Sequence, residues 1–88
     1  MILEILCYRN KGIGAYTQPW HSQSSLDNEV EGLTRSLFMS SEARTKLKKM
    51  VLYHLGTFDD KTGKYDLLSE PELLLDCDDV IAQVPEEK

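Results

Sequence analysis

The sequence predicts an α+β fold: a small antiparallel sheet of about four strands, in the order ββαββ, with one main amphipathic helix on one face. Residues 59–64 read Asp-Asp-Lys-Thr-Gly-Lys between two apolar and aromatic segments, which is typical of a β-hairpin turn. Four apolar residues recur at the spacing of one helix face: Leu26, Val30, Leu33 and Leu37. A single helix covers only one sheet face, so the other face is left for a partner chain or a ligand.

The N-terminal part predicts two strands. Residues 2–8 are apolar and short, and the turn signal Asn-Lys-Gly follows at residues 10–12. Residues 13–17 predict a returning second strand that ends before Pro19. Residues 21–25 are polar, so we interpret them as the loop that leads into the helix.

The helix is expected to begin after Ser24 or Ser25, either of which can cap it. Acidic residues follow at once, near the positive end of the helix dipole. Glu31 and Arg35 are four residues apart, in the favourable order for an ion pair. Gly32 weakens a helix, and we interpret it as a point of close packing against the sheet.

Residues 40–49 predict either a second short helix, capped by Ser40 or Ser41, or a basic loop. Residues 50–58 and 64–68 predict the strands of the hairpin, and Ser-Glu-Pro at 69–71 is expected to end the second. Residues 72–77 predict a short extra strand or a helical turn, and residues 78–83 another turn of helix. The chain is thus expected to form one domain over residues 1–83, with a frayed acidic tail at 84–88.

Composition limits the classes of function. A chain of 88 residues makes one domain with a small core, which self-association would help to stabilise. The net charge of −5 argues against a protein coated in positive charge. Nothing indicates secretion, and no apolar segment approaches the length of a membrane span. Cys7 and Cys77 are expected to be free thiols, although a disulfide is feasible if the C-terminal segment packs beside the first strand.

Two groups of residues are candidates for contacts with nucleic acid. Aromatic rings can stack on unpaired bases while neighbouring cations hold phosphates, and the first group combines both: Arg9, Lys11, Tyr16 and Trp20. The second group is a basic cluster that can follow a phosphate backbone: Arg44, Lys46, Lys48 and Lys49. The alternatives are a solvated surface for the cluster and an anchoring role for the two aromatics. Tyr53 and Phe58 are assigned to the sheet.

The sequence gives no positive case for catalysis, a cofactor or a metal. His and Cys lack the paired spacing of a zinc site, and the 59–64 segment is too short for a calcium loop. The sequence contains no nucleophile elbow and no phosphate-binding glycine loop. The chain is therefore predicted not to be an enzyme.

Three segments carry a resemblance to a known family. Residues 9–20 contain Arg, a nearby Lys, Ala-Tyr and then Pro-Trp; residues 55–63 read Leu-Gly-Thr-Phe-Asp-Asp-Lys-Thr-Gly; and Pro71 precedes the final apolar segment. In order, spacing and length the chain resembles the small non-structural protein of gokushovirus-type Microviridae, phages with circular single-stranded DNA genomes. The resemblance covers about the first twenty residues and residues 52–80, and the middle of the chain departs from it.

The resemblance implies a phage protein that binds single-stranded DNA with little sequence preference in the host bacterial cytoplasm. It would favour single-strand genome synthesis and packaging over further duplex replication. The alternative is an acidic protein–protein adaptor that modulates replication or capsid assembly proteins without touching DNA. A homo-oligomer is expected in either case, with the uncovered sheet face buried between subunits.

Overall fold

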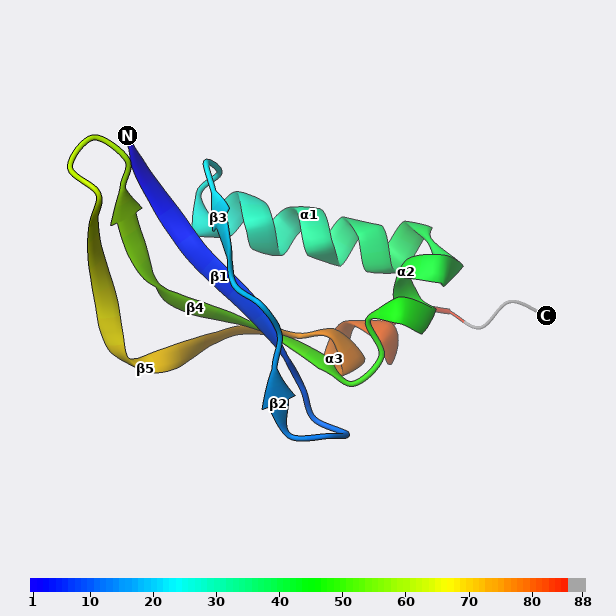
Figure 1. Ribbon diagram of the computed structural model, residues 1–88. Coiled ribbons are helices and arrows are strands. Elements are labelled where there is room, and N and C mark those ends of the chain that lie inside the picture. The colour runs from blue at the N-terminus through cyan, green and yellow to red at the C-terminus, as the bar shows by residue number, and fades with distance from the viewer. Residues whose placement is uncertain (86–88) are drawn as a thin grey trace.

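The protein is described here by a computed structural model that covers residues 1–85 and has an α+β fold. Its elements in chain order are β1 (Ile2–Asn10), β2 (Ala15–Tyr16), β3 (Trp20–Ser22), α1 (Leu26–Met39), α2 (Ser41–Lys46), β4 (Met50–Asp59), β5 (Lys64–Asp76) and α3 (Cys77–Ile81). The sheet is antiparallel, with β1 and β4 central, β5 at one edge, and β2 and β3 both paired with the other side of β1 (Figure 1). No helix in residues 1–85 is long and apolar enough to cross a membrane.

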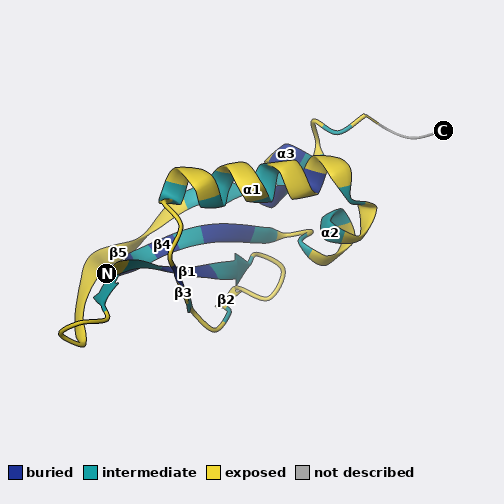
Figure 2. Cartoon of the chain, turned by 90° about the horizontal axis from the view of Figure 1, so that it is seen from above, coloured by how far each residue is buried: buried dark blue, intermediate teal, exposed yellow. Residues whose placement is uncertain are grey.

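The helices lie against one face of the sheet. Figure 2 shows α1 and α3 on the same side of the strands, with α2 at one end. Leu37 of α1 is fully buried against Cys77 and Val80 of α3, and Tyr8 of β1 and Leu75 of β5 pack on this group. Burying these apolar side chains is the main favourable contribution that this layer makes to folding.

The predicted helix and its caps are confirmed. The Ser25 side chain accepts a hydrogen bond from the Asn28 N–H at 3.2 Å, and Glu31 pairs with Arg35 at 3.1 Å. Of the two structures expected for residues 40–49, a short helix or a basic loop, the short helix is confirmed as α2, and Ser40 caps it. The interpretation of Gly32 is wrong: a Cβ built there meets nothing within 4 Å, so the glycine marks no close approach to the sheet.

The second strand and the following loop differ from the prediction. Only Ala15–Tyr16 of the expected strand pairs with β1, because Gly14 turns the chain with φ +69°. The loop expected at 21–25 instead begins inside β3, since Trp20–Ser22 pairs with residues 4–6 of β1. The long β1 offers a free edge there, and pairing along an edge depends on tertiary position rather than on local composition.

The break expected at residues 69–71 is also wrong, because β5 continues through it to Asp76. Residues 64–67 pair with β4, and so do residues 72–76 apart from Leu74, while residues 68–71 have no Cα partner there. Pro71 is tolerated because it lies in this unpaired part of an edge strand, where a missing N–H removes no ladder hydrogen bond. The extra strand expected at 72–77 is thus the end of β5, and α3 begins at Cys77.

Cys7 and Cys77 are both buried free thiols, as the sequence predicted. Burial raises the pKa of the Cys77 thiol to about 11, with Asp76 and Asp78 adding to the effect. The thiolate is the reactive form, so the native thiol is expected to be unreactive. Of the expected tail, Val84 still donates to the Ile81 carbonyl at 3.1 Å, and residues 86–88 lie outside the described part of the chain.

The hairpin turn provides a first testable prediction. Gly63 has φ +74° and donates its N–H to the Asp59 carbonyl at 2.7 Å, which closes the turn. A β-branched side chain is strained at this φ, so Gly63→Val is expected to lower the free energy of unfolding by about 1–2 kcal/mol. Urea denaturation measures this. A Cβ at Gly63 meets nothing within 4 Å, so an unchanged stability would mean that the backbone conformation is wrong.

Candidate nucleic-acid interface

The sheet has a second face that no helix of residues 1–85 covers (Figure 2). Successive side chains of a strand point to opposite faces, so the strand register assigns each residue to one of them. Tyr8 packs under α1, and Ser22 donates to Glu29 of α1, which places these two on the helix side. The other side, which we call the open face, consists of Leu3, Ile5, Cys7, Arg9, Tyr16, His21, Val51, Tyr53, Gly56, Phe58, Tyr65, Leu67, Leu73 and Asp76.

Aromatic rings gather on the open face near the β4–β5 hairpin. His21 stacks on Phe58 with ring centroids 4.9 Å apart, and Phe58 contacts Tyr65 at 4.6 Å. Three different strands, β3, β4 and β5, supply these rings. Tyr65 is 51% exposed, so an apolar, flat-sided group remains accessible at this end of the sheet.

A second aromatic group lies further along the open face, toward the end of β1. Tyr16 meets Tyr53 edge-on with centroids 5.5 Å apart, and Tyr16 is 50% exposed. The Arg9 guanidinium lies 5.7 Å from the centre of the Tyr16 ring, within the range of a cation–π interaction. The arrangement therefore places a fixed cation beside an exposed ring.

Charge is distributed unequally between the two faces. The chain carries 15 acidic and 10 basic residues, yet among the residues that the strand register assigns to the open face Asp76 is the single acid. Asp76 lies at its margin, where the Lys11 ammonium contacts it at 2.8 Å. The open face is therefore free of uncompensated negative charge, whereas α1 carries Asp27, Glu29 and Glu31.

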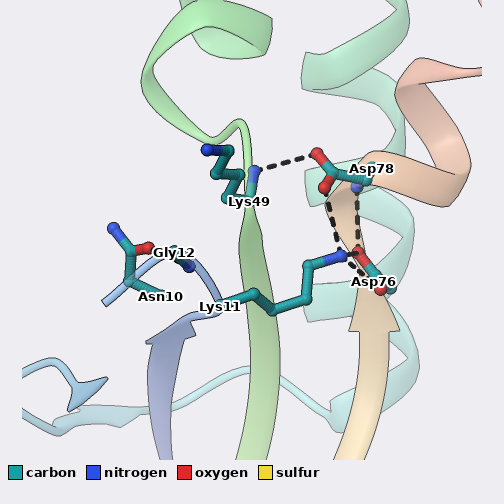
Figure 3. Close-up of polar contacts among 6 residues, drawn as sticks. All are labelled: Asn10, Lys11, Gly12, Lys49, Asp76 and Asp78. Atoms are coloured by element: carbon teal, nitrogen blue, oxygen red, sulfur yellow. Dashed lines mark hydrogen bonds and ion pairs between the residues drawn. The ribbon is translucent and has the colours of Figure 1, made fainter. Parts of the chain in front are cut away.

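Lys11 is held by carboxylates instead of being free for a ligand. Its Nζ lies 2.8 Å from Asp76 and 3.1 Å from Asp78, and the Asp78 carboxylate also accepts the Lys49 N–H at 2.8 Å (Figure 3). These hydrogen bonds raise the pKa of Lys11, and the Lys49 N–H followed by Lys11 lowers the pKa of Asp78. The cluster ties the β1–β2 loop and the start of β4 to the start of α3.

The basic cluster is divided between two grooves. Arg44 donates to the carbonyls of Leu37 and Phe38 at 2.8 and 3.3 Å, and so caps the end of α1. Lys46 lines a groove on the helix side beside Glu29 and Tyr8, while Arg44 lines a second groove beside α3 together with Lys48 and Lys49. The Lys49 side chain lies beside Gly12 of the β1–β2 loop, and Figure 3 shows it pointing away from Asp76 and Asp78.

The two aromatics of the first candidate group lie on opposite faces. Tyr16 is on the open face, while Trp20 is opposite Leu6 and packs on Tyr8, with centroids 5.2 Å apart, on the helix side. This placement agrees with the anchoring alternative for Trp20. Of the residues chosen from sequence, the structure therefore brings together Arg9 and Tyr16 on the open face, with Lys11 at its margin.

Sequence reasoning missed four aromatic rings of the open face: His21, Tyr53, Phe58 and Tyr65. Alternation along β4 would place Tyr53 and Phe58 on different faces, because they are five residues apart. Leu55 has no partner in β1, and this bulge brings both rings to the same face.

Comparisons with known proteins give no match, whether with family models, with curated proteins or with solved structures.

Proposed function

We propose that this protein binds single-stranded DNA, with little sequence preference, through the open face of its sheet. The supporting observation is that an acidic chain keeps this face free of uncompensated acids and arranges exposed aromatic rings and an arginine on it. Rings stack on bases of any identity, and stacking leaves the base edges unread, so the expected sequence preference is small.

The two aromatic groups suggest a path for the strand. Bases stack on Tyr65 and Phe58 near the hairpin and on Tyr16 and Tyr53 further along, while Arg9 holds a phosphate between or beside them. In a duplex each base face is already covered by its neighbour. The proposed face therefore prefers unpaired strands.

Few cations lie close enough to the open face to contact phosphates, so the affinity for single-stranded DNA should depend only modestly on salt concentration. Lys11 is neutralised by two aspartates and Arg44 caps α1, which leaves Arg9 and Lys49 as cations near the path. Each phosphate contact with a single strand contributes about 0.7 to the slope of log affinity against log salt, so a total of about 1–2 is expected.

The biological role that we propose follows from the resemblance to gokushovirus non-structural proteins. A protein that covers unpaired strands would favour single-strand genome synthesis and packaging over copying into duplex, in the cytoplasm of the host bacterium. Nonspecific stacking suits this role, because a genome strand must be bound along its whole length.

Replacement of one ring tests the proposal. Tyr16→Ala is expected to weaken binding to a labelled single-stranded oligonucleotide by about 1–3 kcal/mol with little change in the salt slope. Arg9→Gln should instead lower that slope by about 0.7. Fluorescence anisotropy at several salt concentrations measures both.

The matched control for the ring is Phe38→Ala, because Phe38 is an aromatic residue of α1 with 42% exposure that lies off the open face. It should leave the affinity unchanged. Equal losses for Tyr16→Ala and Phe38→Ala would contradict a path along the open face.

The adaptor remains the second candidate, since exposed Leu67 and Leu73 also belong to the open face and suit an apolar protein contact. If the parent protein binds no single-stranded DNA at low salt, the adaptor replaces the DNA-binding proposal.

A further inference from the structure

No strand of the described residues 1–85 pairs with the outer edge of β5. β5 ends the strand order β2–β1–β4–β5, and its residues 64–73 are all exposed. Leu67 is among them, with 64% of its surface exposed. Figure 1 shows β5 along the outer margin of the sheet. A free edge offers N–H and C=O groups that can pair with another strand.

The part of this edge that suits pairing is limited on both sides. Gly63 belongs to the hairpin turn, and Pro71 has no N–H to donate. Between them, residues 64–70 form a continuous extended segment, and its charges have opposite signs at the two ends: Lys64 at the start and Glu70 at the end. Within residues 1–85 neither side chain forms an ion pair in the single chain.

We propose that a second copy of this chain pairs antiparallel along residues 64–70, with a two-fold axis at Leu67. In this register Lys64 lies opposite Glu70 of the partner subunit, twice by symmetry, and the two Leu67 side chains meet at the centre. A register centred on Asp66 would place two carboxylates opposite each other, which is unfavourable. Charge complementarity thus favours a second copy of this chain as the partner strand, and it favours the register centred on Leu67.

This arrangement differs from the dimer expected from sequence. Burying the sheet face between subunits would cover Tyr16 and Tyr53. Edge pairing about an axis perpendicular to the sheet leaves them exposed and joins the two open faces into one surface. The use of this longer surface to bind single-stranded DNA rests on the proposed function, whereas the dimer itself does not.

Sedimentation equilibrium of the full chain with reciprocal charge changes tests the dimer. Lys64→Glu and Glu70→Lys alone each convert two attractions into repulsions, and each should raise the dimer dissociation constant about tenfold or more. The double variant Lys64→Glu/Glu70→Lys should restore it. Both residues are exposed, so the fold is expected to be retained, as circular dichroism will verify.

Leu67→Lys provides a second test, because two lysines would meet at the axis; Met39→Lys, at an exposed position on α1, is its control. A protein that stays monomeric at all concentrations would overturn the proposal, and so would a dimer whose dissociation constant is unchanged by every substitution on β5. A dimer disrupted by Tyr53→Lys and not by Leu67→Lys would show face-to-face association instead. If the protein forms the β5-edge dimer but binds no DNA, the dimer proposal stands and the proposed DNA-binding function is contradicted.

Discussion

Leu37→Ala is expected to lower the free energy of unfolding by about 3–5 kcal/mol, because truncating a fully buried leucine removes its transfer free energy and leaves a cavity. Leu37 has no exposed surface and lies where α1 meets Cys77 and Val80 of α3. A small domain has only about 5–15 kcal/mol of stability in total, so the variant should be close to unfolding.

Urea denaturation monitored by circular dichroism measures this loss. The control is Met39→Ala, two residues further along α1 at a position that is 79% exposed, and it should change stability by less than about 0.5 kcal/mol. A similar small change for Leu37→Ala would mean that α1 does not pack on α3 as described.

Gly56→Ala is expected to be comparably destabilising, for a different reason. Gly56 has φ +150°, and a Cβ there would lie 2.3 Å from the Asp66 carbonyl oxygen and 2.7 Å from the Leu67 Cα. Both are backbone atoms of β5, so the strand itself must shift. Backbone strain and overpacking together suggest a loss of about 2–5 kcal/mol.

The control for Gly56→Ala is Gly32→Ala, the same change in the middle of α1, where a Cβ meets nothing within 4 Å. Alanine is the better helix former, so this variant should gain about 0.5–1 kcal/mol. Thermal unfolding compares the two. Equal melting temperatures for both variants would contradict the close approach of β4 and β5 at Gly56.

Elements with a strong local signal could be predicted from the sequence. The helix has a regular apolar spacing and a serine cap, and the hairpin turn has Asp59 and Gly63, so short-range chemistry defines both. Features that depend on pairing between distant segments could not be predicted. β3 forms because β1 offers an edge to Trp20–Ser22, and β5 passes through Pro71 because residues 68–71 need no partner.

The candidate site shows the same limit. Arg9 and Tyr16 were chosen from their residue types and sequence proximity, and the register places them together. The ion pairs of Lys11 with Asp76 and Asp78 could not be predicted, because the two aspartates are more than sixty residues away along the chain. The basic cluster of residues 44–49 suggested one surface from spacing alone, and the cap that Arg44 makes on α1 shows that proximity in sequence does not determine orientation.

The central claim is that single-stranded DNA lies on the open face, and NMR titration of the isotope-labelled protein with a short single-stranded oligonucleotide tests it most directly. We expect the largest chemical-shift changes at Tyr16, Tyr53 and Tyr65 and at the Arg9 side chain, with little change on the outer side of α1. Shifts confined to α1 and α2, or none at low salt, would contradict it.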